Sequence, residues 1–333
     1  MRIAVVGAGG AHKTEAAIVR AARSLGHHCR LVNVVGWSRY TGRLAGRAVR
    51  YLVDRIEPDF VLLTRHAIEV GEPALRRILR GREAVFWYFD AEPKPKVLAL
   101  GRLVGRMYIT CLGQVGRYRT AGVEQVRFLP QGVDPHEDRP AARAPRRYAC
   151  DASFIGSGQY PYRYAVLRAV AATCRLQIRG PGWEHAPGDL PVAGGPIHGR
   201  SLRQAIRGAA ISLGANARPE QDEDRASASN RMWKVMGCGG FYLGPYVPDI
   251  EWFAVGHRHC AWYRSGDEAA ELVRHYLAAP EERRRIAEAG RAHALAHHTY
   301  AHRMRLLLAD GEYQAGPPSD DGVVPELEYP NAR

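Results

Sequence analysis

The chain has 333 residues, enough for two domains of ordinary size with separate cores, and 46% of them are hydrophobic, as in globular proteins. No apolar run reaches the roughly 20 residues that cross a bilayer, and the start, MRIAVVGAGG, lacks the apolar core of a secretory signal, so we expect a cytoplasmic protein. The net charge is +13, and residues 1–150 hold 26 Lys and Arg against 13 Asp and Glu, so the whole excess lies in the first half. This asymmetry favours a polyanionic partner.

Short apolar runs alternate with helical patterns, which predicts βαβ units and parallel sheets. In the first half, we expect strands at 2–6, 30–35, 59–63, 84–89, 107–112 and 126–129. Helices are expected between them, near 13–25, 39–55, 72–80, 96–105 and 114–121. The following segment, 134–149, is rich in Pro and charge and is predicted to be a linker.

The alternation then starts again. Strands are predicted at 152–156, 175–179, 210–213, 240–244 and 259–263. Helices are predicted near 162–173, 201–208, 229–237, 267–278, 281–297 and 300–309. We therefore expect two Rossmann-like α/β domains, 1–133 and 150–312, facing across a cleft, and a poorly ordered tail at 313–333.

Two segments of the second half point to a phosphate. FIGSGQYPYR predicts a strand, a glycine turn and a helix, in which backbone N–H groups of Gly156, Ser157 and Gly158 approach a phosphate and Arg163 adds charge. The alternative is that these glycines serve only the packing of the turn.

The second segment is SNRMWKVMGCGG. Arg231 and Lys234 share one helix face, and Gly239 and Gly240 end the helix, which fits a diphosphate leaving group. The alternative is a surface cation pair beside a helix-ending glycine.

These segments carry a resemblance. FLPQGVDP, FIGSGQYPYRYAVL, LQIRGPGW, SNRMWKVMGCGGFYL and VPDIEWF, in this order, resemble the spore-maturation (CgeB-like) glycosyltransferase family over about residues 125–305. The resemblance implies a GT-B fold, a nucleotide-sugar donor, UDP-linked by expectation, and no required metal or other cofactor. It also adds the glycine turn at Gly180 to the donor site.

One position departs from that family. Related GT-B enzymes carry a ribose-binding Glu where this chain has Lys234, and a Lys cannot accept hydrogen bonds from ribose. Either another acceptor, such as one in the acidic run 222–224, replaces the Glu, or Lys234 contacts a phosphate.

Sugar transfer by direct displacement needs a base at the acceptor hydroxyl. His12 follows the first strand and Asp90 ends the fourth, both at the expected cleft edge. We predict a His12–Asp90 dyad, or Asp90 alone as base, with His66 in reserve. The alternative is that His12 lines the turn and Asp90 caps the next helix.

The basic excess gathers in the loops at the same edge. Arg39, Arg43, Arg47 and Arg50 are spaced by four, four and three residues, so they are predicted to form one cationic stripe on a helix. Residues 37–53 contain no Asp or Glu that could neutralise this stripe, which favours a polyanionic partner. The predicted acceptor-binding residues are Trp37, Arg39, Tyr40, Arg43, Arg47, Arg65, His66, Lys94 and Lys96.

Our leading hypothesis is that the acceptor is a hydroxymethylated base in DNA that leaves the base stack. The hypothesis rests on the charge distribution and on analogy with phage enzymes that glucosylate such bases on GT-B folds. The alternatives are a small-molecule, lipid, polysaccharide or protein acceptor, or a non-catalytic nucleic-acid-binding protein. No metal site is expected: the histidines at 293, 297, 298 and 302 lack a completing ligand, and the six cysteines form no CxxC pair.

Overall fold

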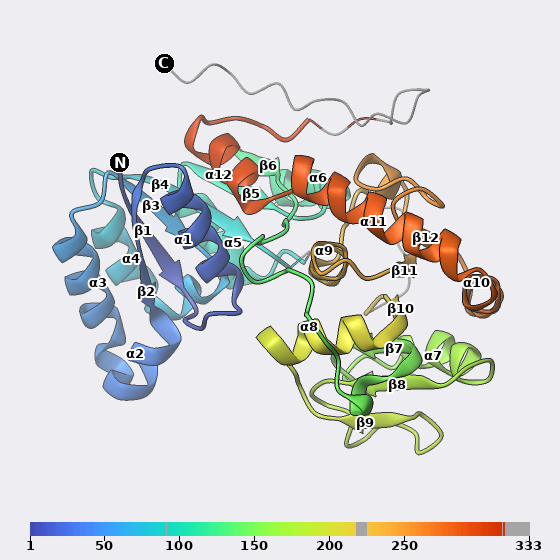
Figure 1. Cartoon of the computed structure of the whole chain (residues 1–333). Coiled ribbons are helices and arrows are strands. Elements are labelled where there is room, and N and C mark those ends of the chain that lie inside the picture. Colours follow the sequence, from blue (N-terminus) through green and yellow to red (C-terminus); the bar gives the residue numbers. More distant parts are fainter. Residues whose placement is uncertain (91, 218–224, 315, 317–333) are drawn as a thin grey trace. The chain divides into compact units, whose positions relative to one another are not determined.

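The computed structural model describes residues 1–90, 92–217, 225–314 and 316, apart from the side chains of Thr41 and Arg43. The described chain divides into two compact units (Figure 1). Unit 1 consists of Met1–Gln131 with Tyr300–Gln314, and unit 2 consists of Gly132–Thr299. The acidic run 222–224 and nearly all of the predicted tail lie outside the described residues.

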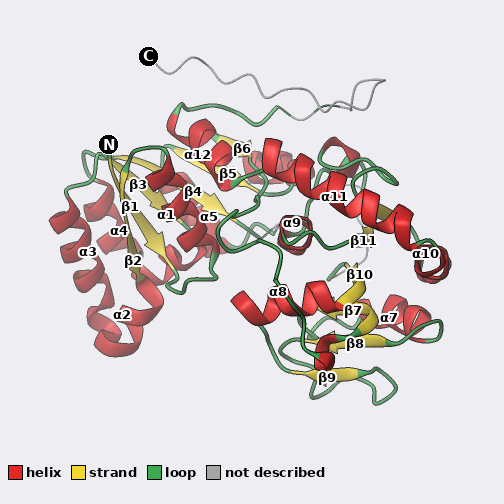
Figure 2. Cartoon of the chain, in the orientation of Figure 1, coloured by secondary structure: helices red, strands yellow, loops and turns green. Residues whose placement is uncertain are grey.

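Unit 1 is built on a parallel six-stranded sheet of order β2-β1-β3-β4-β5-β6 (Figure 2). Its strands are β1 (Arg2–Gly7), β2 (His28–Asn33), β3 (Phe60–Leu63), β4 (Glu83–Tyr88), β5 (Arg106–Ile109) and β6 (Val126–Phe128). Its helices are α1 (Thr14–Ser24), α2 (Val34–Thr41), α3 (Ala45–Ile56), α4 (Glu72–Leu79), α5 (Pro95–Leu103), α6 (Val115–Thr120) and α12 (Tyr300–Leu308), with 3-10 turns η1 (Gly42–Leu44), η2 (Arg65–Val70) and η3 (Leu112–Gln114).

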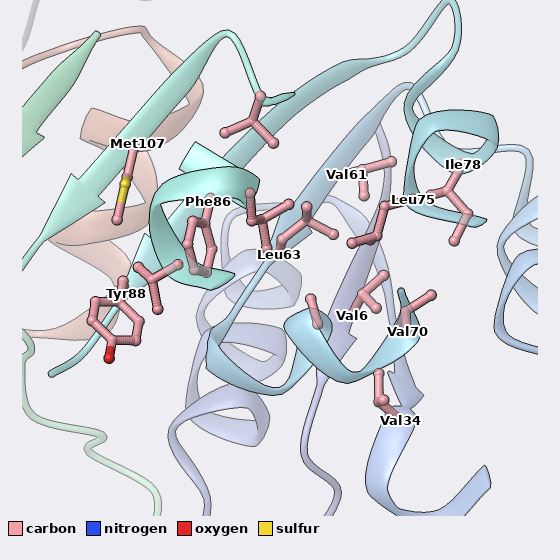
Figure 3. Close-up of a cluster of buried hydrophobic side chains, with 14 of the residues drawn as sticks. Val6, Val34, Val61, Leu63, Val70, Leu75, Ile78, Phe86, Tyr88 and Met107 are labelled. Carbon is pink, nitrogen blue, oxygen red and sulfur yellow. The ribbon is translucent and has the colours of Figure 1, made fainter. Parts of the chain in front are cut away.

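The strand order of unit 1 reverses between β1 and β3. Right-handed crossovers then place α1 on one face of the sheet and α3, α4 and α5 on the other. The packing agrees, because α1 contacts α12 while α3 contacts α4. A core of this unit lies between the sheet and α3, α4 and α5; it includes Val6, Leu63 and Phe86 of the strands and Leu75 and Ile78 of α4 (Figure 3).

Unit 2 is a second parallel six-stranded sheet, of order β12-β11-β10-β7-β8-β9. Its strands are β7 (Cys150–Ile155), β8 (Leu176–Arg179), β9 (Val192–Gly194), β10 (Ala209–Leu213), β11 (Tyr242–Pro245) and β12 (Ala261–Tyr263). Its helices are α7 (Arg163–Ala171), α8 (Gly199–Gly208), α9 (Asn230–Gly237), α10 (Gly266–Ala278) and α11 (Pro280–His297), with 3-10 turns η4 (Arg146–Tyr148) and η6 (Ile250–Trp252). Here the order reverses between β7 and β10.

Two expectations about the elements are wrong. The helix expected at 39–55 is interrupted, because α2 ends at Thr41 and Gly42 adopts a φ of 50° before the η1 turn and α3. The short strand β9 was not predicted, and two of its three residues are exposed, so its sequence carries no apolar alternation.

Within residues 1–314, as far as the structure describes them, the chain passes between the units twice, so the predicted domain limits need correction. The helix expected at 300–309 is present as α12, but it packs in unit 1. There Arg303 is fully buried and donates to the carbonyl of Pro130 at 3.0 Å. The expected linker 134–149 lies in unit 2, where its residue Glu137 accepts from Arg203 at 3.3 Å.

Candidate active site

The carboxyl ends of β7 and β10 mark the reversal point of the unit 2 sheet, which is where ligands of such sheets bind. Arg163, at the start of α7, connects the loops that follow these two strands. Its Nη1 donates to the carbonyl of Ser157 at 2.6 Å, and its Nε donates to the carbonyl of Ala215 at 3.2 Å. The sequence predicted Arg163 at this turn, but it did not predict the hydrogen bond to Ala215.

A second guanidinium stands at the same point. Arg231, in the first turn of α9, donates from Nε to the carbonyl of Ile155 at 2.8 Å. Its Cζ lies 4.5 Å from the ring centroid of Phe154, and Arg163 lies 5.5 Å from the same ring. Two predicted donor-binding residues are therefore brought together on one aromatic side chain.

Neither guanidinium has a carboxylate partner among the described residues. Arg163 is only 8% exposed, and burial, with the nearby charge of Arg231, lowers its pKa to about 10. Burial also lowers the pKa of Arg231, and the phenols of Tyr242 and Tyr263 are its electrostatic neighbours. Two desolvated cations without a counterion form a site that favours a bound anion. The two tyrosines were missed, because strand positions gave no sign of a polar role.

The glycines of the turn do not act as expected. The N–H of Gly156 donates to the carbonyl of Arg179 at 2.9 Å, and that of Gly158 donates to the carbonyl of Pro181 at 2.9 Å. A Cβ on Gly180 would lie 1.9 Å from the carbonyl oxygen of Gly156. The amides of Gly156 and Gly158 are thus used in packing one loop against another, and the prediction that they face a phosphate is corrected.

Gly156 has a more specific role. A Cβ at this position would lie 2.4 Å from Nη2 of Arg231. The glycine therefore makes room for the guanidinium of Arg231 directly over the turn.

The other predicted donor-binding residues, Lys234, Gly239 and Gly240, lie farther along α9 or after its end. Nζ of Lys234 lies 3.3 Å from Oδ1 of Asp138, which is 4% exposed, so this lysine has an internal partner. Gly239 and Gly240 follow the other end of α9, roughly 12 Å from its start. There Gly239 adopts a φ of 73° and Gly240 packs against Ile206, so they end the helix and are removed from the site of Arg231.

In unit 1 a buried polar network shapes the loop after β1. Oε1 of Glu15 accepts from the N–H of Ala8 at 3.1 Å and from the hydroxyl of Thr64 at 2.8 Å. Oδ1 of Asn33 accepts from the N–H of Gly9 at 2.8 Å and from that of Gly36 at 3.0 Å. This network, which the sequence analysis missed, fixes the turn that carries His12; Glu15 in the first helical turn was its only signal.

The two predicted base residues, His12 and Asp90, are not shown as partners of each other. Asp90 forms an ion pair with Arg65, with 3.1 Å between its Oδ2 and Nη1. Strand β3 lies between β1 and β4, so the strands before His12 and Asp90 are roughly 10 Å apart, with the β3 loop of Arg65 between them. The partner that the structure gives Asp90 is therefore a cation, and the dyad with His12 stays a prediction.

Tyr88, at the end of β4, interacts with the carboxylate of Asp90. Tyr88 is buried, and burial, the charge of Asp90 and a hydrogen bond to Asp90 raise its pKa, while Arg65 opposes the shift. The reserve candidate His66 is engaged through Nδ1 with Glu69 at 2.8 Å.

The predicted acceptor-binding residues lie on exposed segments of unit 1. Trp37 is 37% exposed and Tyr40 is 88% exposed on α2. Arg39 and Arg47 are exposed, on α2 and α3 respectively. The single stripe is corrected, since the break at Gly42 puts these arginines on two helices and Arg50 pairs with Asp54 at 3.3 Å. Nothing is described of the Arg43 side chain.

Lys94 and Lys96 are exposed at the start of α5, which has no acidic residue in its first turn. They add positive charge where the helix dipole is already positive, an arrangement that an anion would stabilise. Unit 1 holds 24 Lys and Arg against 12 Asp and Glu. Its excess of +12 agrees with the asymmetry read from the sequence.

His259, His293 and His298 pack together in unit 2, whereas His302 lies on α12 in unit 1. The rings of His259 and His293 are stacked with centroids 4.2 Å apart, and Nε2 of His293 contacts the carbonyl of Phe253 at 2.8 Å. Nε2 of His298 lies 3.2 Å from Nε2 of His293. Within the described ranges, no three His, Cys, Asp or Glu side chains are placed to hold a metal, the six cysteines are free, and no helix has the length and hydropathy of a membrane span.

Comparison with known proteins shows which family model and which solved structures this chain resembles. Residues 163–309 match a family model described as glycosyl transferase-like, and the match includes Arg163 and Arg231. No curated protein sequence matches the chain significantly. Solved structures that share the fold include HepE of Anabaena in complex with UDP and glucose, at 13% identity and a TM-score of 0.63, over 93% of this chain and 99% of that one.

The chain has the GT-B glycosyltransferase fold. Sucrose-phosphate synthase from Thermosynechococcus elongatus is similar over 92% of this chain and 98% of its own, at 13% identity and a TM-score of 0.64. An alpha-glucosyltransferase in complex with UDP-glucose and DNA containing an abasic site is similar over the same shares, at 10% identity and a TM-score of 0.64. The expected GT-B fold and the expected enzyme class, a glycosyltransferase, are confirmed. Membership of the spore-maturation family is not confirmed.

Proposed function

We propose that this glycosyltransferase moves a sugar from a nucleotide-sugar donor to a hydroxyl group. The observation that carries the proposal is the pair Arg163 and Arg231, desolvated at the reversal point of the unit 2 sheet and without a carboxylate partner among the described residues. Two guanidiniums match the charge of a diphosphate and can bind its oxygens in a bidentate manner. UDP is the proposed nucleotide, because UDP or UDP-glucose occupies several structures of the same fold.

The same pair also accounts for the chemistry of the leaving group. As the bond between the anomeric carbon and the diphosphate oxygen breaks, the electron pair stays on the diphosphate, which gains negative charge. Cations already fixed by Ser157, Ala215 and Ile155 stabilise that charge without reorganising.

In a direct displacement, the acceptor hydroxyl loses its proton to a base as its oxygen bonds to the anomeric carbon. We assign this role to His12, because the turn that carries it is fixed by Glu15 and Asn33. Asp90 forms an ion pair with Arg65, so we give Asp90 the role of orienting the guanidinium of Arg65.

The acceptor is proposed to be a polyanion, with hydroxymethylated bases in DNA favoured. The supporting observations are the +12 charge of unit 1, the exposed Trp37, Arg39 and Tyr40 on α2, and the exposed Arg47 on α3. Aromatic rings next to cations suit bases stacked beside a phosphate backbone. The similar alpha-glucosyltransferase in complex with UDP-glucose and DNA containing an abasic site is an example of DNA bound to a protein of the same fold.

The test incubates the protein with a panel of nucleotide sugars and with hydroxymethylated or unmodified duplex DNA, and then digests the DNA and weighs the nucleosides. The proposal predicts a mass increase of one sugar on hydroxymethylated DNA only. Donor hydrolysis without DNA modification would retain the enzyme and reject the acceptor, in favour of a small molecule, lipid, polysaccharide or protein. DNA binding without donor consumption would indicate the non-catalytic alternative. The spore-maturation type stays a proposal that rests on the sequence motifs alone.

A further inference from the structure

A hollow of 510 Å³ lies in unit 2 between the segment that precedes β7 and the helix α8. Figure 1 shows this segment crossing α8, and the two elements are in contact at η4. The hollow is lined by Arg143, Ala144, Pro145, Arg147, Arg200, Ser201 and Gln204. It contains none of the donor residues described above, so that site does not account for it.

The charge of this hollow is one-sided. Arg143, Arg147 and Arg200 line it, and no Asp or Glu does. None of the three pairs with a carboxylate in the part of the chain that the structure describes. Arg203, one turn along α8, shows the contrast, because it pairs with Glu137 at 3.3 Å. Three exposed cations without carboxylate partners around one hollow favour a bound anion, and Arg147 also stacks on Tyr148, with 4.8 Å between its Cζ and the ring centroid.

Gln204 provides an independent observation. It is 8% exposed, yet its side-chain amide has no hydrogen-bond partner among the described residues. Gln204 lines the hollow and its amide atoms remain accessible there, so the amide can donate an N–H to a ligand. Gln204 and Arg200 are four residues apart on α8 and therefore lie on one face of the helix.

The first turn of α8 adds to this arrangement. The helix has ten residues, begins at Gly199 and has no acidic residue in that turn. The positive end of its dipole favours negative charge close to Arg200 and Ser201, and Oε2 of Glu137 already lies 3.9 Å from where a Cβ on Gly199 would stand.

We propose that this hollow is a second anion site, specific for a phosphoryl group, with Arg143, Arg147 and Arg200 as its cations and Gln204 as a neutral donor. The phosphoryl group comes either from a small phosphate compound or from the backbone of a nucleic acid. The site is independent of the donor arginines, so it does not depend on the proposed function.

The test is isothermal titration of the full-length protein with sodium pyrophosphate and, separately, with a 20-base-pair duplex. The variant Arg147→Gln/Arg200→Gln changes only exposed side chains, and Arg274→Gln, exposed on α10 of the same unit, is the charge control. Titration in an Arg231→Gln background separates this site from the donor site.

We expect the double variant to weaken pyrophosphate binding about tenfold or more in both backgrounds, while Arg274→Gln has no effect. If the phosphoryl group belongs to a nucleic acid, only duplex binding changes, and its salt dependence falls by about two counterions. Gln204→Leu should weaken the same ligand without lowering the urea midpoint. Unchanged affinity of the double variant for both probes would overturn the proposal, whether or not the donor site binds UDP.

Discussion

Nζ of Lys234 lies 3.3 Å from Oδ1 of Asp138, a carboxylate that is 4% exposed. Burial raises the pKa of Asp138, while Lys234 and a hydrogen bond from the backbone of Asp134 oppose the shift. The lysine that stands in place of a ribose-binding Glu is therefore part of an internal ion pair between α9 and the segment before β7.

Lys234→Met should lower the free energy of unfolding by about 3 kcal/mol, because it leaves the carboxylate of Asp138 buried without its cation. Adding Asp138→Asn should restore most of that loss. Urea denaturation of the two single variants and the double variant measures the coupling. A Lys234→Met protein that keeps full stability but loses UDP binding would instead assign the lysine to the donor.

Gly156→Ala should abolish most donor binding and cost about 1–3 kcal/mol of stability, because the new methyl group would lie 2.4 Å from Nη2 of Arg231. Gly188→Ala is the matched control in the same unit, since a Cβ there meets nothing within 4 Å. Thermal unfolding and UDP titration of both variants check this. Equal behaviour of the two proteins would show that Arg231 does not need the space above Gly156.

The fold was largely predictable, and each failure has an identifiable physical cause. Apolar runs such as AVVG and FVLL are buried strands of parallel sheets, and they showed where the strands lie. The helix 39–55 was wrong because one residue, Gly42, reverses the backbone without changing the amphipathic pattern around it. The assignment of α12 to unit 1 depends on long-range contacts such as Arg303 with Pro130, which no local pattern encodes.

The candidate site, like the fold, was predictable in part. The positions of Arg163 and Arg231 after predicted strands were enough to place them at the sheet edge, where the structure brings them together. The use of the Gly156 amide was not predictable, because it depends on Arg179 of the neighbouring strand. The role of Lys234 was hidden for the same reason, since its partner lies 96 residues away in sequence.

Stability should fall as the pH drops from 7.5 to 5. Burial, followed by nearby positive charge, lowers the pKa of His259 to about 3, and burial lowers that of His293 to about 4, both from 6.5. The unfolded chain then binds more protons than the native state below pH 6.5, so each histidine costs about 2 kcal/mol by pH 5.

Urea midpoints at several pH values measure this slope. His259→Phe keeps a stacked ring without the titrating group, so it should remove about half of the slope, whatever its effect on stability at pH 7.5. A slope equal to that of the unchanged protein would contradict the assignment.

Tyr40→Ala should weaken binding to duplex DNA about tenfold without a measurable change in stability, because Tyr40 is 88% exposed. Arg47→Gln should reduce the salt dependence of binding by about one counterion, whereas Arg274→Gln should not. Fluorescence anisotropy over a salt series measures both effects. Unaltered affinity and salt dependence would remove α2 and α3 from the acceptor surface.

The central claim is that Arg163 and Arg231 hold the diphosphate of the donor. The most direct measurement is the dissociation constant for UDP of the unchanged protein, Arg231→Gln and the control Arg274→Gln, each shown to be folded by its urea midpoint. The account predicts that Arg231→Gln binds UDP about 10- to 100-fold more weakly, while Arg274→Gln binds it normally. Equal UDP affinity of all three proteins would contradict it.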